Sequence, residues 1–524
     1  MLRRRVNLLT GALVLVAALV LLAVSAQGAA AANPQLCGET GKNDAFVITL
    51  KDASCTTTVT QVAPGTYDIV VHDYSTFHNF HLSGPGSVNK ATTVAEVTTV
   101  TWTVTLVSGS YHFQCDAHAL SGMQGDFTVT ASGGWTTPVD ASSPDASGIP
   151  DVRVGVDGTG KAVLLWQKTT NSAVQFRTRS ATGTLGSVNT LDTGGGPARP
   201  QVAVNKLGGV AFAWVYNDGS HTVVRARTIL NGVMSPKQTI SSTSENAFDP
   251  DVSIDDAGNA YFVWSSGAGG VKTRKRDAGG ALSSFQDISP GGGGPGRPHV
   301  AANASGEAWF TWLQKSGSFT VAKARKRSSA GTLDDTKTLS STSQNAVAPQ
   351  VGISDAGNAV FAWTLATGAN QARRWTGTAL SGVYSLSPTG PGGQVQVAVD
   401  RTSGNAGLLW RHADGSGLRA QSRTLSSGGA LGAVKTLSAA GADAAGPQVG
   451  IDSSSNLVFL WRRSSAIQAV AQSAGGTLGA VKDVTATRAT GLPALAVADN
   501  GKAVGTWVKQ LSPTDFRIQV SAGP

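Results

Sequence analysis

Charged residues are scarce in this sequence, and helix-forming patterns are nearly absent. Asp, Glu, Lys and Arg make up 14% of the 524 residues, whereas glycine alone occurs 64 times. Outside the N-terminus no segment shows the apolar spacing of an amphipathic helix. A composition rich in Gly, Ala, Ser and Thr favours many short strands joined by tight turns. The sequence therefore predicts an all-β protein that is long enough for two or more domains.

Positive charge is in small excess once the N-terminus is set aside. The formal net charge is +9, and three of these charges belong to Arg3, Arg4 and Arg5. The remaining chain is mildly basic and gives no sign of the strongly basic surface that nucleic-acid binding requires. We therefore expect no nucleic-acid partner.

A long apolar run occurs once, near the N-terminus. The three arginines precede an apolar stretch from Leu8 to about Val24, and alanines follow it. This order is typical of an export signal. We predict that residues 1–32 are a signal peptide, cleaved after Ala26 or Ala32, and that the mature protein is secreted or extracytoplasmic. A retained N-terminal anchor is the alternative, and no later segment is apolar enough to span a membrane.

The three cysteines do not have the spacing of a zinc site. Cys37 and Cys55 flank a predicted strand near residues 46–50. In an oxidising compartment we expect these two to form a disulfide, which would stabilise a small domain by roughly 3 kcal/mol. Cys115 then remains as a free thiol. The alternative is that all three cysteines bind metal.

The free cysteine lies in a run of residues that can bind metal. The sequence Cys-Asp-Ala-His-Ala-Leu-Ser-Gly-Met places Cys115, His118 and Met123 on one tight loop. His78 lies 37 residues before Cys115, in the run His-Asn-Phe-His-Leu. Two imidazoles, one thiolate and one thioether are the ligand set of a type 1, or blue, copper site. Such a site transfers single electrons.

Strand alternation supports the choice of Cys115 as a buried ligand. In the run that ends at Cys115, the side chains of Tyr111, Phe113 and Cys115 share one face of a strand. Cys115 therefore ends a row that faces the core, whereas His112 and Gln114 face outward.

The same alternation distinguishes the two histidines of the upstream run. His78, Phe80 and Leu82 are expected to face inward, and Asn79 and His81 are expected to face away. We therefore predict His78, and not His81, as the copper ligand.

These residues resemble the cupredoxins, in particular plastocyanin and amicyanin. The spacing Cys115-x2-His118-x4-Met123 is that of plastocyanin, and the run that begins at His78 is similar to the first-ligand strand of amicyanin. The resemblance covers roughly residues 44–130. It implies a Greek-key β-sandwich, which we place at residues 33–131, and one mononuclear copper.

The resemblance also implies roles for individual residues. Met123 would be a weak axial ligand beside the trigonal set of His78, Cys115 and His118. Asn79 would hydrogen-bond between the two ligand loops. His118 would lie nearest the surface and pass the electron. The predicted disulfide is a departure, because plastocyanin and amicyanin lack it.

Residues 132–524 contain an internal repeat. Each unit has the pattern Pro-x-Val-x-Val/Ile, a glycine-containing turn, a short apolar run and a tryptophan, as in Pro250–Ile254, Gly258 and Trp264. The tryptophans recur every 46–51 residues, which is typical of a β-propeller with four strands per blade. They are Trp166, Trp214, Trp264, Trp312, Trp363, Trp410, Trp461 and Trp507.

The last unit of the repeat lacks a fourth strand after residues 516–520. Residues 134–142, which include the strand-like run Trp135–Ala141, can supply it from the front of the array. This pairing would close eight blades into a ring and leave no bare sheet edge. An open solenoid is the alternative.

Other side chains of the repeat have a structural and a functional interpretation. We expect the tryptophans to fill the spaces between blades rather than to bind carbohydrate. The turns near Asp255 and Asp355 fit hairpins better than calcium sites. Alternating arginines form either a solvated outer face or a docking surface for an acidic protein or an anionic wall polymer. These are Arg177, Arg179, Arg225, Arg227, Arg274, Arg276, Arg325 and Arg327.

The sequence thus predicts an exported electron carrier with one type 1 copper, a redox partner protein and a propeller for placement. The alternative is an adhesion or recognition propeller whose cupredoxin domain binds or sequesters copper without redox turnover. A multicopper oxidase needs eight further histidines, and the whole chain has eight. Nitrous oxide reductase also joins a cupredoxin to a propeller, but its binuclear copper needs two ligand cysteines in one loop. We therefore predict that the chain is not an enzyme.

Overall fold

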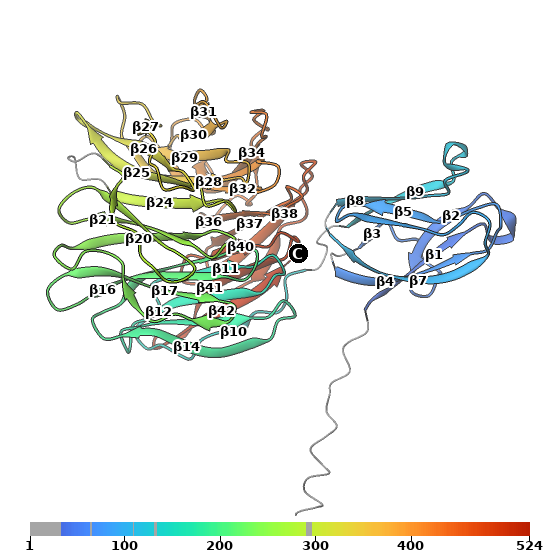
Figure 1. Ribbon diagram of the computed structural model, residues 1–524, viewed down its shortest axis with the longest axis horizontal. Helices are drawn as coiled ribbons and strands as arrows, with labels where there is room; N and C mark the ends of the chain where they lie inside the picture. The colour runs from blue at the N-terminus through green and yellow to red at the C-terminus, as the bar shows by residue number, and fades with distance from the viewer. Residues whose placement is uncertain (1–32, 63–64, 108, 130–133, 290–295, 524) are drawn as a thin grey trace, which may run out of the picture.

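The computed structural model describes residues 33–62, 65–107, 109–129, 134–289 and 296–523, which fold into strands joined by turns and loops (Figure 1). The helical elements in these ranges are two short 3-10 turns, η1 (Lys42–Asp44) and η2 (Ala119–Ser121). No helix in the same ranges has the length and apolar character needed to cross a membrane. The predicted all-β class is confirmed. The predicted signal peptide and the predicted boundary between residues 131 and 132 lie outside the described residues.

The strands between residues 35 and 129 form two sheets. In the first sheet β1 and β4 are parallel and the other neighbours are antiparallel. Its strands in spatial order are β2 (Ile48–Asp52), β1 (Gln35–Thr40), β4 (Gly65–Asp73) and β7 (Thr98–Leu106). In the second sheet β3 and β9 are parallel and the others antiparallel. Its strands in spatial order are β3 (Gln61–Val62), β9 (Gln124–Val129), β8 (Gly109–Gln114), β5 (His81–Gly84) and β6 (Val88–Ala91).

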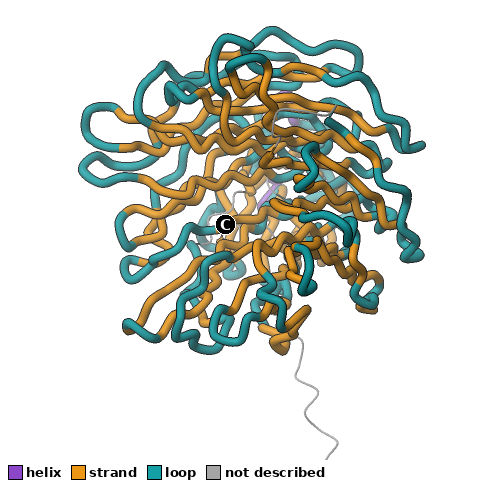
Figure 2. Tube along the Cα trace, turned by 90° about the vertical axis from the view of Figure 1, so that its left-hand side faces the viewer, coloured by secondary structure: helices purple, strands orange, loops and turns teal. Residues whose placement is uncertain are grey.

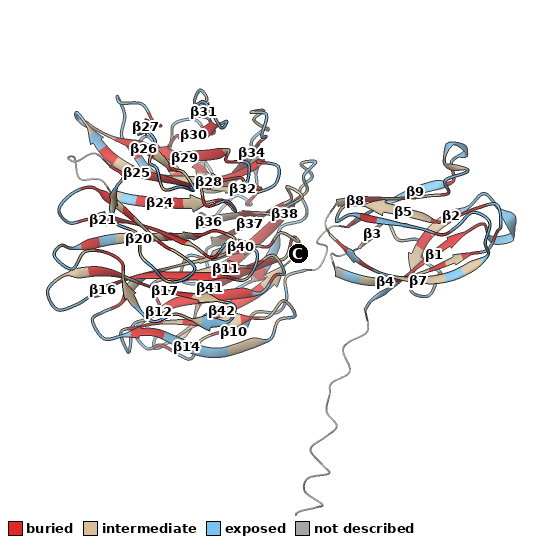
Figure 3. Cartoon of the chain, viewed as in Figure 1, coloured by how far each residue is buried: buried red, intermediate tan, exposed pale blue. Residues whose placement is uncertain are grey.

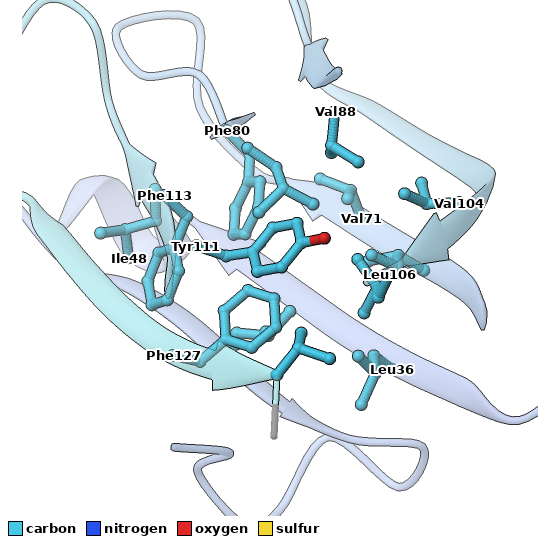
Figure 4. Packing of buried hydrophobic residues seen from close by; sticks show 14 of the residues in the cluster. Leu36, Ile48, Val71, Phe80, Val88, Val104, Leu106, Tyr111, Phe113 and Phe127 are labelled. Atoms are coloured by element: carbon cyan, nitrogen blue, oxygen red, sulfur yellow. The ribbon is translucent and has the colours of Figure 1, made fainter. Parts of the chain in front are cut away.

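The two sheets share one apolar core (Figure 4). Alternation along β4 buries Ile69 and Val71, and alternation along β8 buries Tyr111 and Phe113. The rings of Phe80 and Phe113 stack with their centroids 5.6 Å apart. Each of these large side chains contributes about 1.5–3 kcal/mol when it is buried. The core therefore extends from the middle of both sheets to the end of β8, where Cys115 follows.

A disulfide joins Cys37 in β1 to Cys55, which follows β2. The bond spans 18 residues of sequence and cross-links the first hairpin of this sheet. A cross-link of this loop length restricts the unfolded chain and stabilises the fold by about 3 kcal/mol.

Replacement of both bonded cysteines by serine is expected to lower the free energy of unfolding of this sandwich by about 3 kcal/mol, because the unfolded chain regains the freedom that the loop had removed. Hydrogen exchange of the β1 and β2 amides, followed by mass spectrometry, measures the change. Wild-type protein treated with a dithiol reductant serves as the control and should lose protection in the same strands. Unchanged protection in the double variant would contradict the prediction.

The strands between residues 139 and 523 form eight antiparallel sheets. The first sheet has β11 (Val152–Val156), β12 (Ala162–Lys168), β13 (Ala173–Arg179) and β14 (Leu185–Thr193). The second has β15 (Ala198–Val204), β16 (Val210–Asn217) and β17 (Thr222–Leu230), with β18 (Val233–Met234) and β19 (Gln238–Thr239) both paired to β17. The third has β20 (Ala247–Ile254), β21 (Ala260–Ser266), β22 (Val271–Arg276) and β23 (Gln286–Asp287). The fourth has β24 (Gly296–Ala302), β25 (Ala308–Ser316), β26 (Phe319–Arg327) and β27 (Lys337–Thr338).

The remaining four sheets continue the same order. The fifth has β28 (Ala346–Ile353), β29 (Ala359–Leu365), β30 (Asn370–Trp375) and β31 (Tyr384–Ser385). The sixth has β32 (Gly392–Val399), β33 (Ala406–Ala413), β34 (Leu418–Leu425) and β35 (Lys435–Thr436). The seventh has β36 (Ala444–Ile451), β37 (Leu457–Arg463), β38 (Ala466–Gln472) and β39 (Lys482–Thr485). The eighth has β40 (Ala494–Val497), β41 (Ala503–Ser512), β42 (Asp515–Gly523) and, at its edge, β10 (Val139–Asp140).

The eight sheets are arranged as a β-propeller. The first strand of each sheet contacts the first strand of the next sheet, and β40 contacts β11, so the contacts form a closed ring. Strands fill the body of this ring, and loops and turns lie at its edges (Figure 2). The second strand of each sheet is the most continuously buried, as β21 and β29 are along their whole length. Buried residues lie mainly within the strands, and exposed residues lie mainly in the loops (Figure 3).

The eight repeated tryptophans belong to the core of the propeller. Each is at most 1% exposed. Trp264 of β21, for example, lies in one cluster with Ala211, Ala213 and Val224 of the preceding sheet. The prediction that these rings fill the spaces between sheets is confirmed, because their apolar faces pack against the neighbouring sheet.

The arginines of the third strands already have partners within the propeller. One set donates its Nε–H groups to backbone carbonyls of the following loop, as Arg227 does to Ser235 at 2.9 Å. A second set, Arg179, Arg276 and Arg327, is at least nine-tenths buried. The guanidinium group of Arg225 bonds to the buried Asp192 at 2.9 Å. The docking of an acidic partner on these arginines stays a prediction, and each of the eight makes at least one hydrogen bond inside the fold.

Candidate metal centre

Three of the four predicted ligands converge at one end of the sandwich. The Nδ1 atoms of His78 and His118 are 3.1 Å apart. The Sγ atom of Cys115 lies 3.4 Å from Nδ1 of His118 and 3.8 Å from Nδ1 of His78. A point equidistant from three atoms so spaced lies about 2 Å from each, which is the length of metal–nitrogen bonds in proteins. The three donor atoms therefore fit a single metal ion, and their chemistry is that of the trigonal plane of a type 1 copper site.

The loop after β8 returns the backbone of the fourth predicted ligand, Met123, to Cys115 and His118. The N–H of Cys115 donates to the carbonyl of Met123 at 3.0 Å, and the N–H of Met123 donates to the carbonyl of His118 at 3.2 Å. Gly122, at the end of η2, takes the left-handed conformation that this return requires. Met123 is 1% exposed and belongs to the same core cluster as Cys115.

The ligands differ in their access to solvent. Cys115 and His78 are buried, whereas His118 is partly exposed. Phe46 is 60% exposed, and its ring lies 5.1 Å from that of His78 and 4.8 Å from that of His118. Phe77 and Leu120 are also exposed near these histidines in the sequence. Phe46, Phe77 and Val94 line one hollow with the two histidines, so the partly exposed His118 opens to solvent among apolar side chains.

The segment that carries His78 differs from the sequence-based prediction. Strand β5 begins at His81, so strand alternation does not govern residues 78–80. The prediction that Asn79 faces away from the core is wrong, because Asn79 is 2% exposed. Hydrogen bonds hold the segment instead: the N–H of Phe80 donates to Oγ1 of Thr92 at 2.8 Å, and Thr92 donates to the carboxylate of the buried Asp73 at 2.6 Å.

Asn79 connects the two ligand segments. Its Nδ2 donates to Oδ2 of Asp116 at 2.8 Å, and the N–H of Asp116 donates to its Oδ1 at 2.7 Å. Asp116 follows Cys115 directly, so these two bonds tie the cysteine loop to the residue after His78. This is the connection that the resemblance implies for Asn79.

His81 is not one of the three converging donor residues, and its ring nitrogens contact Asp116 and Asn89 instead. Its Nδ1 lies 2.7 Å from Oδ1 of Asp116, and its Nε2 lies 2.6 Å from Oδ1 of Asn89. Burial alone would lower the pKa of His81, but the bonds to Asp116 and Asn89 outweigh burial and raise it. Burial alone would raise the pKa of Asp116, but bonds from Gln114, His81 and Asn79 hold it below its usual range. The resemblance implied the contact with Asn79, but no sequence pattern indicated that His81 and Gln114 also bond to Asp116.

A second group of potential ligands lies in the first sheet. Cys37, Cys55 and His72 have ligand atoms within 4.8 Å of one another. The two sulfur atoms are bonded to each other, and Nδ1 of His72 lies 3.1 Å from Oγ1 of Thr99. The alternative that all three cysteines bind one metal is therefore wrong. In the described part of the propeller no group of three such side chains is close enough to hold a metal ion.

No protein-family model matches the sequence, and no curated protein matches it. Solved structures with a similar fold include puromycin hydrolase, at 12% identity and a TM-score of 0.40, over 72% of this chain and 61% of that chain. The intramolecular trans-sialidase from Ruminococcus gnavus in complex with oseltamivir carboxylate matches at 9% identity and a TM-score of 0.35, over 62% of this chain and 94% of that chain. The WD40 domain from Toxoplasma gondii coronin matches at 8% identity and a TM-score of 0.37, over 62% of this chain and 80% of that chain. Similarity at this level concerns the fold alone.

The prediction that the chain is not an enzyme is wrong in its reasoning. It rested on the numbers of histidines and cysteines, which bear on multicopper oxidases and nitrous oxide reductase. The puromycin hydrolase and the sialidases among the similar structures are enzymes, so neither those counts nor a propeller fold excludes an enzyme. The similarity assigns no reaction to this chain.

Proposed function

We propose that this chain is a type 1 copper protein that transfers single electrons. In this proposal residues 33–131 are a cupredoxin-like Greek-key sandwich, and residues 132–524 are a propeller with one blade per sheet. The observation that carries the proposal is the triangle of His78 Nδ1, Cys115 Sγ and His118 Nδ1, with sides of 3.1, 3.4 and 3.8 Å. A copper ion bound there would alternate between Cu(II) and Cu(I) and so carry one electron.

The protein holds its ligands in fixed positions. Cys115 lies at the end of the core-facing row of β8, and His78 is fixed through the bonds of Asn79 and Phe80 to neighbouring segments. Burial keeps water away from the thiolate and from one imidazole. Ligands that cannot move keep the same geometry in both oxidation states, which favours rapid electron transfer.

Electrons would enter and leave through His118. Its ring is the partly exposed one among the four predicted ligands, and the neighbouring Phe46 is mostly exposed. A redox partner that docks on this end of the sandwich would therefore approach His118 most closely. The mature protein would act outside the cytoplasm, where the propeller would place the copper domain against its partner or a surface.

Cyclic voltammetry of the copper-loaded full chain tests the proposal. We expect one reversible one-electron wave whose area corresponds to one copper per chain. Apo-protein is the control and should give no wave. Tight binding of Cu(I) without a reversible wave would contradict electron transfer and support copper sequestration instead.

Replacement of Met123 by leucine is expected to keep copper bound and to raise the reduction potential, because a weak donor to Cu(II) is lost while the strong ligands remain. Voltammetry and metal analysis measure the two effects. Met234→Leu, at a methionine in β18 of the propeller, is the matched control and should leave the potential unchanged. Complete loss of copper from Met123→Leu would contradict a weak axial role.

A further inference from the structure

Two neighbouring sheets of the propeller carry arginines where the other repeats do not. The two residues after the repeated tryptophan are Arg411 and His412 in the sixth sheet, and Arg462 and Arg463 in the seventh. The second to fifth sheets have no charged residue at these positions, which hold Val215-Tyr216, Ser265-Ser266, Leu313-Gln314 and Thr364-Leu365. The strand that carries these positions has the same place in every sheet, so the difference lies in the side chains alone.

Arg411 and Arg463 reach the same segment from two sheets. Nη1 of Arg411 donates to the carbonyl of Ala444 at 3.2 Å, and Nη2 of Arg463 donates to the carbonyl of Ala440. Residues 440–444 lead from β35 of the sixth sheet to β36 of the seventh, and apart from Asp443 they are alanine and glycine. The two guanidinium groups therefore lie at one junction between the sheets, beside small side chains.

The positive charge at this junction has no carboxylate partner. Within the described ranges Arg411, Arg462 and Arg463 bond to backbone carbonyls and form no ion pair, and the Nε atom of each is buried without a hydrogen-bond partner. Burial lowers the pKa of Arg411, and the exposed Asp443 opposes this shift only in part. Partly buried cations without a counter-ion cost stability, and an anion bound beside them would remove that cost.

The next two sheets around the ring continue the positive charge. Lys509 of the eighth sheet and Lys168 of the first follow their tryptophans by two residues, as Arg463 does. Contacts of β36 with β40 and of β40 with β11 make these sheets consecutive. The second strands all run in the same direction, so their ends lie at one face of the propeller. We call this set of side chains the cationic arc: Arg411, Arg462, Arg463, Lys509 and Lys168.

The carboxylates close to the cationic arc in the chain are mostly engaged elsewhere. Asp414 pairs with Arg419 at 2.7 Å, and Asp515 pairs with Arg517 at 2.8 Å. Asp145 is 1% exposed and accepts the N–H groups of residues 147 and 169. None of the five cations of the arc forms an ion pair in the part of the chain that the structure describes. Positive charge therefore exceeds negative charge along the arc.

We propose that the cationic arc binds a linear polysaccharide that carries one carboxylate per sugar, with Arg411 and Arg463 as its strongest contacts. A guanidinium group binds a planar carboxylate through two parallel hydrogen bonds. Cations that recur from sheet to sheet suit a chain of repeated anions better than one small ion. The backbone carbonyls at the junction accept hydrogen bonds from hydroxyl groups, which every sugar has and which polyphosphate and polyglutamate lack. This inference does not rest on the copper site, and it goes beyond the proposed function by naming what the propeller binds.

Calorimetric titration of the full chain with polygalacturonate at low salt tests the inference. We expect the wild type to bind, and to bind more weakly as salt is added, because ions screen exposed charges. Replacement of both Arg411 and Arg463 by glutamine keeps a donor toward the carbonyls and removes both charges, so it should weaken binding by at least about tenfold. Replacement of both by lysine keeps the charge without the planar fork and should give an intermediate affinity.

The pair Arg227→Gln and Arg325→Gln is the matched control. Nε of Arg227 donates to the carbonyl of Ser235 at 2.9 Å, and Nε of Arg325 donates to that of Asp334 at 2.6 Å, both from third strands of sheets outside the arc. The control removes the same charge and should bind polygalacturonate as the wild type does. An equal loss of affinity in the control would overturn a specific surface, and so would a wild type that does not bind.

Other polymers and a second pair of variants make the test decisive. Equal binding of the neutral glucan pullulan would overturn the role of charge, and tighter binding of polyphosphate or polyglutamate would overturn the assignment to an acidic polysaccharide. If the arginine variants do not fold, Lys168→Gln with Lys509→Gln decides: weaker binding supports the arc, and wild-type affinity overturns it. All these variants should keep the copper spectrum of the wild type, so failure of this inference is distinguishable from failure of the copper site.

Discussion

The Cys115→Ala variant is expected to show no blue colour with Cu(II). The colour of a type 1 site comes from charge transfer between a thiolate and copper, and Cys115 is the one free cysteine in the described residues. Two histidines at 3.1 Å would remain and could still hold some Cu(II), but without the band that the thiolate produces. Absorption spectroscopy at equal protein and copper concentrations measures the loss.

Two further variants make the result specific. Cys115→Ser keeps the size of the side chain and removes the thiolate, so it should also be colourless. His112→Ala removes an exposed histidine of β8 that pairs with Asp126, and it should remain as blue as the wild type. Colour retained by either Cys115 variant would show that another residue supplies the thiolate or that the assignment is wrong.

Replacement of residues 134–142 by a Gly/Ser segment of equal length is expected to abolish cooperative unfolding of the propeller. In the structure Val139 and Asp140 pair with β42 at the edge of the eighth sheet. Asp140 also bonds to Arg517 at 2.8 Å and to Gln519 at 3.0 Å. Each lost hydrogen bond costs about 1 kcal/mol, so several together approach the total stability of a typical domain.

The same replacement would expose the outer edge of β42. A bare edge pairs with other chains, so we expect aggregation as well as a lower melting temperature. Calorimetry and size-exclusion chromatography follow the two effects. Lys482→Ala, at the exposed start of the edge strand of the seventh sheet, is a control that keeps the ring closed. A melting curve equal to that of the wild type would contradict the role of this segment in closing the ring.

The sequence predicted the elements of the site that depend on local spacing. Cys115, His118 and Met123 lie in one short loop, and a tight turn with a left-handed Gly122 is enough to bring them together. The propeller was predictable for a related reason, since one pattern recurs eight times and each copy forms the same sheet. In both cases the relevant contacts are local or repeat with a fixed period.

Contacts between distant segments were not predictable in the same way. Alternation assigned Asn79 to the outer face because it assumed a strand, but the strand begins two residues later and Asn79 turns inward to Asp116. The arginines of the third strands were placed on one face of each strand, and the sequence did not indicate that nearby loops and sheets would supply their partners. Arg276, for example, bonds to Thr228 of the preceding sheet at 2.8 Å. Pairings of this kind depend on how sheets pack, which strand periodicity does not determine.

The visible absorption spectrum of the full chain during titration with Cu(II) decides whether His78, Cys115 and His118 form a type 1 copper centre. We expect an intense blue band that grows in proportion to added copper, stops at one copper per chain and disappears on reduction. A spectrum that shows only the weak absorption of ordinary Cu(II) complexes would contradict the copper centre formed by His78, Cys115 and His118.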